Sequence, residues 1–164
     1  MPEKKTLKRA RRDARGGKGP GTQAGEFVRE EMEHIRKGKH GARSTKQAIA
    51  IGLSKARRAG VRLAPPKRGT TSEKTRKSAE RAYQKGQAGT PVSPRRSRAR
   101  EKALKREGRG AASKAALSRQ ARSTARRRSA VNRSAAAQKA ARTKGARGRS
   151  EAAKKGPRTR AQRG

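Results

Sequence analysis

The fold is decided by a stretch of 42 residues, which from Thr22 to Leu63 reads TQAGEFVREEMEHIRKGKHGARSTKQAIAIGLSKARRAGVRL. Its first half has the apolar spacing of one helix face, with Phe27 at the edge. The residues on this face are Ala24, Val28, Met32 and Ile35. The four glutamates around this face are a dense share of the 11 acidic residues of the chain, and Gly38 with Gly41 ends the pattern. This half predicts an amphipathic helix.

The second half of the stretch predicts another helix. Ser44 is followed three residues later by Gln47, a capping-box spacing in which each side chain satisfies a free backbone N–H. Gly60 is placed to end the helix at its C′ position. Small residues on one face let the first helix approach closely: Ala48, Gly52 and Ala56. We therefore expect an antiparallel hairpin.

The apolar contacts of this hairpin are few. We expect them to come from Val28, Met32, Ile35, Ile49 and Leu53. So thin a core stabilises a small unit only weakly. The predicted fold class is mostly α plus disorder, with a small two-helix hairpin, further marginal helices and a long basic low-complexity tail.

The remaining segments follow from local composition. Pro65-Pro66 and the glycines break helical patterns, whereas residues 109–164 reduce mainly to Ala, Arg, Lys, Ser and Gly. The predicted segments are a basic disordered arm over residues 1–21, the hairpin over 22–64, a linker over 65–71, two marginal basic helices within 72–108 around a linker at 86–93, and a tail over 109–164 that is disordered or becomes helical on binding. We expect the first marginal helix to end at Gly86.

Charge is the dominant feature of the composition. The chain of 164 residues has 50 Lys and Arg against 11 Asp and Glu, a formal net charge of +39. The segment 91–164 holds 25 basic and 3 acidic residues. Such a charge needs a polyanion, and nucleic acid is the expected partner. A membrane is not expected, because apolar anchors and a spanning segment are missing.

The candidate nucleic-acid contacts are cationic side chains in the hairpin, the second marginal helix and the tail. They are Lys39, Arg43, Lys46, Lys55, Arg57, Arg58, Arg95, Arg96, Arg98, Arg100, Arg126, Arg127, Arg128, Arg147, Arg149, Lys154 and Lys155. Each neutralises a phosphate and releases counterions, so affinity falls with salt. The alternative is a solvated, self-repelling arm that only keeps the protein soluble.

Two short motifs leave two interpretations each. Ser93-Pro94-Arg95-Arg96 matches the S-P-basic-basic pattern of histone tails, which implies a turn that places arginines in an A·T-rich minor groove. It equally fits a helix that starts at Pro94 with Ser93 as N-cap. The loop 39–43 leads to a helix N-terminus that can hold one phosphate, although a plain turn with an N-cap explains it as well.

Other chemistries have little support. The chain has no Cys, two His and one Asp, so no nucleophile, base and orienter can be assembled, and we expect no enzyme and no cofactor. His34 and His40 do not share a helix face. Glu30 with His34 has a spacing that can meet a metal, but an ordinary surface ion pair is far commoner, and we expect no metal.

Two resemblances add to these observations. Residues 22–32 and 39–54 resemble a bacterial family of small basic proteins of unknown function, which implies a bacterial origin and no assigned activity. The second half of the chain is similar in composition to the basic tails of linker histones and histone-like nucleoid proteins.

The function expected from the sequence is sequence-nonspecific binding of a nucleic-acid backbone, of DNA in preference to RNA, as in histone-H1-like or nucleoid compaction within the cytoplasm. An RNA- or ribosome-associated basic protein is the alternative. A protein-partner adaptor is the third hypothesis, in which residues 22–63 bind a partner or a second copy through the acidic first helix and the tail anchors the complex electrostatically.

Overall fold

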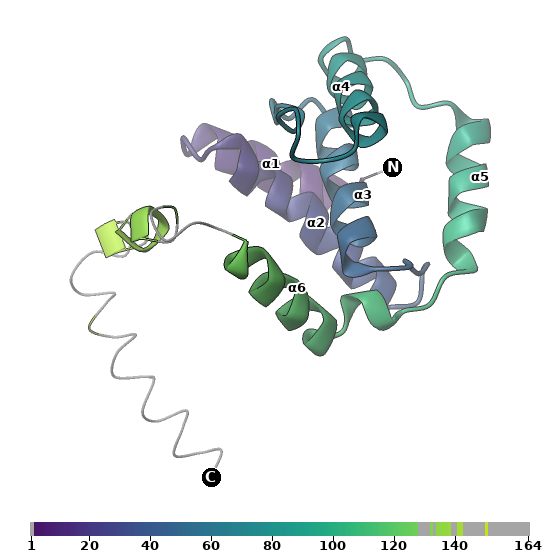
Figure 1. Ribbon diagram of the computed structural model, residues 1–164. Helices are drawn as coiled ribbons and strands as arrows, with labels where there is room; N and C mark the ends of the chain where they lie inside the picture. Colours follow the sequence, from purple (N-terminus) through teal and green to yellow (C-terminus); the bar gives the residue numbers. More distant parts are fainter. Residues whose placement is uncertain (1, 128–131, 133, 139–140, 143–149, 151–164) are drawn as a thin grey trace. The chain divides into compact units, whose positions relative to one another are not determined.

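The computed structural model describes residues 2–127, 132, 134–138, 141–142 and 150. Its elements are α1 (Lys4–Arg15), α2 (Pro20–Arg36), α3 (Thr45–Arg58), α4 (Glu73–Gln87), α5 (Pro94–Lys105), the 3₁₀ turn η1 (Gly110–Ala112) and α6 (Lys114–Arg126) (Figure 1). These residues contain no strand, so the predicted mostly α class is confirmed. The chain divides into one compact unit up to Gln120 and a second from Ala121 onward. Within the second, the described residues after Arg127 are helical.

The expected hairpin is formed by α2 and α3, which lie side by side (Figure 1). Ser44 caps α3 and accepts a hydrogen bond from the backbone N–H of Gln47. The Gln47 side chain accepts from the backbone N–H of Arg43 at 2.7 Å, one residue before the N-cap, so the capping box is only half formed. Gly52 sets the helix separation, because a Cβ there would lie 2.7 Å from the Cα of Val28.

The prediction of a basic disordered arm over residues 1–21 is wrong, because this segment contains α1 and the start of α2. Thr6, Ala10 and Asp13 are buried on one face of α1, which packs against α2. Asp13 forms a 2.8 Å ion pair with Lys18 at the turn between the two helices. Tertiary burial therefore orders a segment whose own sequence is strongly basic.

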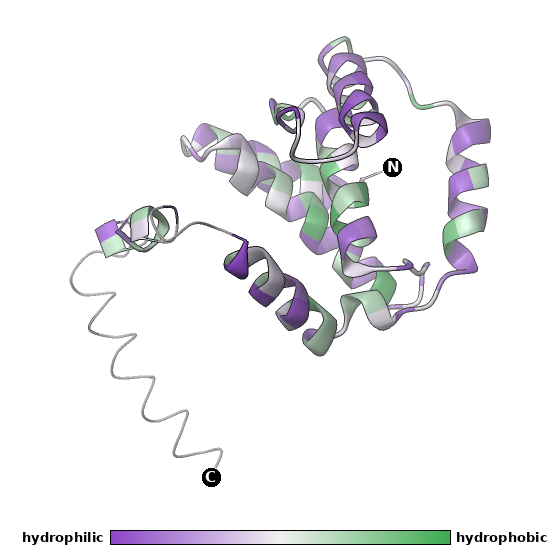
Figure 2. Ribbon diagram, in the orientation of Figure 1, coloured by the Kyte–Doolittle hydropathy of each residue, from purple (hydrophilic) through white to green (hydrophobic). Residues whose placement is uncertain are grey.

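The core consists of two small clusters. One joins Met32, Ile35, Ala42, Ala48, Ala111 and Ala112, with Val28, Ile49 and Leu117 packed against it. The other joins Ala10, Ala24, Phe27, Ala56 and Val61, with Leu7, Leu53 and Leu63 against it. The most hydrophobic parts of the ribbon lie along α2 and α3 (Figure 2). Phe27, expected at an edge, is among the most deeply buried side chains, since α1 covers it.

The tail predicted from residue 109 as disordered, or as helical on binding, is already packed against the hairpin at its start. Ala112 is fully buried in the first cluster, and its carbonyl accepts a 2.9 Å hydrogen bond from Arg36 Nε. The Ala111 carbonyl accepts one of 2.7 Å from Thr45 Oγ1. η1 is thus held to α2 and α3, and α6 follows it. Low sequence complexity did not prevent packing here, because alanine is small enough to fill a narrow site.

The two marginal helices differ in how they are held. α4 packs on α3 and buries Ala79 and Ala82. It continues past Gly86, its predicted end, to Gln87, and Gly89 takes the left-handed conformation with φ of 62°. A Cβ at Gly86 would collide with the Arg57 carbonyl oxygen, so glycine serves helix contact rather than helix termination. α5 contains no buried residue.

Candidate nucleic-acid interface

The acidic side chains of the described residues are paired with basic side chains of the same chain. Of the 11 Asp and Glu residues, Glu151 lies outside the described part. Each of the other ten has an oxygen within 4.0 Å of a basic side chain of the same chain. The carboxylates therefore offset charge locally, and the excess of Lys and Arg stays positive toward solvent.

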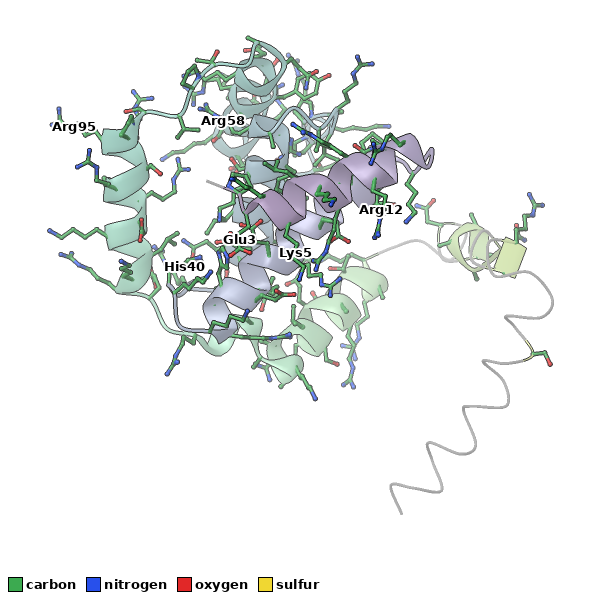
Figure 3. The ribbon with its side chains drawn as sticks, turned by 180° about the vertical axis from the view of Figure 1, so that it is seen from behind. Glu3, Lys5, Arg12, His40, Arg58 and Arg95 are labelled. Atoms are coloured by element: carbon green, nitrogen blue, oxygen red, sulfur yellow. The ribbon has the colours of Figure 1, made fainter. Side chains whose placement is uncertain are left out.

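The clearest cationic element is α5. Its exposed basic residues, with the C-cap residue, are Arg95, Arg96, Arg98, Arg100, Lys102, Lys105 and Arg106. With 3.6 residues per turn they cover more than half of the helix circumference, and the partly buried Ser97 and Leu104 share the remaining face. The single acid, Glu101, pairs with Lys105 at 3.0 Å. Figure 3 shows side chains projecting to both sides of α5, with Arg95 at its start.

The motif Ser93-Pro94-Arg95-Arg96 forms the start of this helix. Pro94 occupies its first turn, as one of the two interpretations expected. Ser93 is the N-cap residue but makes no side-chain cap hydrogen bond. Arg95 and Arg96 are thus helical and exposed, and they do not form the turn that the histone-tail pattern implies.

Two predicted contacts have structural tasks instead. Arg57 is only 7% exposed, and it donates hydrogen bonds to the carbonyls of Leu63 at 3.1 Å and Ala64 at 3.2 Å. Burial lowers the pKa of its guanidinium. Lys55 forms a 2.6 Å ion pair with the buried carboxylate of Glu31. Neither side chain is free to bind a phosphate, since each is held by other groups of the chain. The sequence of the hairpin did not reveal this, because it does not show which face of α3 is covered by α4 and by the segment after α3.

The loop 39–43 is closed by other parts of the chain. The backbone N–H of Gly41 donates to the Leu104 carbonyl at 2.9 Å, and that of Ala42 to the Gly108 carbonyl at 3.0 Å. The turn interpretation therefore accounts for it. Arg43 is still highly exposed beside Glu107, and Lys39 pairs with Glu3 at 2.8 Å.

The other predicted contacts fall into three groups. Lys46 is exposed, and Arg58 is partly buried with a 3.4 Å hydrogen bond to the Pro91 carbonyl. Arg126 ends α6 and is exposed, as is Arg127. Arg128, Arg147, Arg149, Lys154 and Lys155 lie outside the described residues.

Further exposed cations lie on α1 and α4, outside the set of predicted contacts. The exposed ones are Lys4, Lys5, Lys8, Arg11, Arg12 and Arg15 on α1 and Lys74, Lys77, Arg81 and Lys85 on α4. The signal for α1 was present, because Leu7, Ala10 and Ala14 recur at helical spacing. Among so many charges that stripe is short and easily overlooked.

A cluster of acidic, histidine and lysine side chains lies between the start of α1, the end of α2, the loop after α2, and α3. His40 Nε2 is 3.0 Å from Glu31 Oε1, and His34 Nε2 is 2.7 Å from Glu3 Oε1. Glu3 and His40 converge beside α2 in Figure 3. Hydrogen bonds from Lys39, and then from His34, lower the pKa of Glu3 to about 2. The sequence spacing of the histidines gave no sign of this meeting, because the loop 37–41 turns His40 back onto α2.

These observations define a mostly helical, strongly basic protein in which the carboxylates of the described residues pair with basic side chains of the same chain. A family of unknown function, DUF6496, matches residues 20–68, which is α2, α3 and the segment after them. The chain is thus similar to that family over its hairpin. No curated protein and no solved structure matches it. No helix in the described part of the chain is long and apolar enough to cross a membrane.

Proposed function

We propose that this protein binds the phosphate backbone of nucleic acid, DNA in preference to RNA, without reading base sequence, and that it compacts DNA in a nucleoid. The observation that carries the proposal is α5, a helix with no buried residue and exposed cations around most of its circumference. Burial does not account for such a helix, whereas phosphate neutralisation does.

The arrangement of charge on α5 supports duplex DNA as the ligand. The major groove of B-DNA admits an α-helix and has a phosphate backbone on each side. Cations spread over a wide arc of one helix can reach both backbones. The major groove of A-form RNA is deep and narrow, so an RNA duplex offers less room.

The side chains of α5 also explain the lack of sequence reading. Base recognition needs planar amide or acidic side chains, or arginines held in one orientation. The exposed residues of α5 are Arg, Lys, Ala and Pro with a single Glu, and its arginines have no carboxylate partner within the described residues. They are free to follow phosphates on any sequence.

The adaptor hypothesis has less support from the geometry. It requires α2 to offer its carboxylates to a partner, but Glu30 and Glu31 are buried. Glu26 pairs with Arg9 at 3.5 Å, and Glu33 pairs with Arg29 at 3.2 Å. The acidic helix is therefore largely occupied by its own chain.

The test is the salt dependence of binding to a DNA duplex, measured by fluorescence anisotropy with the full-length protein. We expect a linear fall of log K with log salt, and equal affinity for duplexes of unrelated sequence. A variant with Gln at 95, 96, 98 and 100 removes up to four contacts, so its slope should be shallower by roughly 3 to 4. A matched variant with Lys at the same positions keeps the charge and should keep the slope.

Three outcomes would overturn the proposal. One is an affinity that does not change with salt, and another is a strong preference for one duplex sequence. The third is tighter binding to duplex RNA than to DNA of the same sequence, which would favour the RNA-associated alternative. Circular dichroism of both variants checks that α5 substitutions leave the helical content intact.

A further inference from the structure

Glu31, His34 and His40 form a nearly buried cluster of ionisable side chains. The Glu31 side chain has no exposure, and the side chains of His34 and His40 are 12% and 9% exposed. One potential ligand atom from each residue lies within 4.8 Å of the others. Three metal-ligating groups thus converge in a nearly water-free site.

The contacts of Glu31 are incomplete. Lys55 Nζ lies 2.6 Å from Oε2 and His40 Nε2 lies 3.0 Å from Oε1. Neither oxygen, however, receives a hydrogen bond of normal geometry, and both are shielded from water. Lys55 places one positive charge at Oε2, whereas Oε1 faces only the ring of His40, and a buried carboxylate oxygen without a hydrogen bond is costly unless a further cation satisfies it.

The orientation of His40 points to what that cation is. Its Nδ1 lies 3.1 Å from the Gly41 carbonyl, an acceptor only, so Nδ1 holds a proton and donates it there. In a neutral ring Nε2 is then unprotonated. Its lone pair faces the Glu31 oxygen, and two lone pairs at this distance repel unless a positive centre lies between them. Metal-binding histidines typically have this same backbone hydrogen bond on their other nitrogen.

We propose that Glu31, His34 and His40 form a binding site for a divalent transition metal, with zinc as the expected occupant. Zinc favours imidazole nitrogen and carboxylate oxygen, whereas magnesium and calcium favour oxygen alone. Tetrahedral zinc places its ligand atoms roughly 3.3 Å apart. The 3.0 Å separation of His40 Nε2 and Glu31 Oε1 is close to this value.

Neighbouring groups complete the site. Glu3 Oε1, 2.7 Å from His34 Nε2, lies beside the three ligating residues and acts as an outer partner that orients the His34 ring. Lys55 on the other oxygen of Glu31 acts like the outer partner that orients a ligating carboxylate. Because α2 supplies Glu31 and His34 and the loop after it supplies His40, zinc would hold this loop to α2. The inference does not rest on the proposed nucleic-acid binding.

The test uses tag-free full-length protein, since a histidine tag would itself bind zinc. The chain has only two histidines, so their ring resonances in a proton NMR spectrum report on this site alone. After chelator treatment, zinc is added stepwise, and isothermal titration calorimetry follows the same addition. We expect both histidine signals to shift and to saturate at one equivalent, with tetrahedral absorption bands when cobalt replaces zinc.

Variants assign the site. Glu31→Gln and His40→Ala should each weaken zinc binding by about 10-fold or more. Glu33→Gln, the same substitution two residues away on α2 and outside the cluster, should leave it unchanged. If a site variant fails to fold, the titration of the natural protein decides alone. The proposal is wrong if zinc leaves both histidine signals in place, if Glu31→Gln binds zinc normally, or if the histidines respond only to pH as a protonated ion pair would.

Discussion

Replacement of Gly52 by alanine tests whether this residue sets the separation of α2 and α3. In an open helix, Gly→Ala stabilises by about 1 kcal/mol through helix propensity. At Gly52, however, the new Cβ would lie 2.7 Å from Val28 Cα and 2.9 Å from Val28 N. These are backbone atoms, so no side-chain rotation relieves the overlap, and α2 must shift.

The expected magnitude follows from these two opposing effects. Overpacking of a well-packed core costs roughly 1–3 kcal/mol, and a backbone collision belongs near the upper end. After the propensity gain is subtracted, Gly52→Ala should lower the free energy of unfolding by about 1–2 kcal/mol. Gly25→Ala on α2 is the matched control, since no neighbouring atom lies within 4 Å of a Cβ placed at Gly25. It should raise stability by about 0.5–1 kcal/mol.

Urea unfolding followed by circular dichroism measures both variants against the natural chain. The informative quantity is the difference between the two substitutions, because propensity cancels and the steric contribution is left. If Gly52→Ala proves as stable as Gly25→Ala, the close approach of the helices does not depend on Gly52.

Three further predictions concern stability. Arg57→Met should lower the free energy of unfolding by about 1–3 kcal/mol, because two carbonyls lose their donor, and should leave DNA affinity within twofold in anisotropy; a large loss of affinity at unchanged stability would return Arg57 to the interface. Truncation after Gly108 should lower the free energy of unfolding in urea by about 3 kcal/mol, because the core loses two buried alanines of η1 and two hydrogen bonds to it. Truncation after Arg127 should leave the unfolding transition unchanged. Equal stability of the two truncated proteins would show that η1 contributes nothing. A hydrogen bond from Arg76 lowers the pKa of Glu73 below 4.5, so the ionised Glu73 stabilises the folded protein above that pH and this stabilisation is lost as the pH falls. The difference in the free energy of unfolding between Glu73→Gln and the natural chain should therefore shrink between pH 7 and pH 3. A constant difference would refute the pairing.

Local rules of helix formation determined much of the hairpin. Ser44 caps α3 because a free N–H lies within reach of its own hydroxyl, and Gly60 takes a positive φ of 87° after the helix. Gly52 lies on the face that packs because its spacing from Ala48 and Ala56 places it there. Such effects extend over four residues or fewer, so a linear pattern contains them.

The charge of α5 was also legible in the sequence. Pro94 begins the helix, and basic residues at 95, 96, 98 and 100 follow with almost no apolar neighbours. A helix without an apolar stripe has nothing to bury, so its cations stay exposed wherever it lies. For this reason the predicted contacts on α5 agree with their observed exposure, whereas those on α3 depended on what covers that helix.

The tertiary structure alone decided the rest. α1 is helical because α2 buries one of its faces, and Arg57 is enclosed because the segment at Leu63 turns back onto it. Glu3 and His34, 31 positions apart in the chain, come within 2.7 Å only after α1 has packed. Contacts between distant positions leave no local period in the sequence. The sequence by itself thus determined the hairpin and the charge of the chain, while long-range packing decided which cations remain exposed and brought the carboxylates to the histidines.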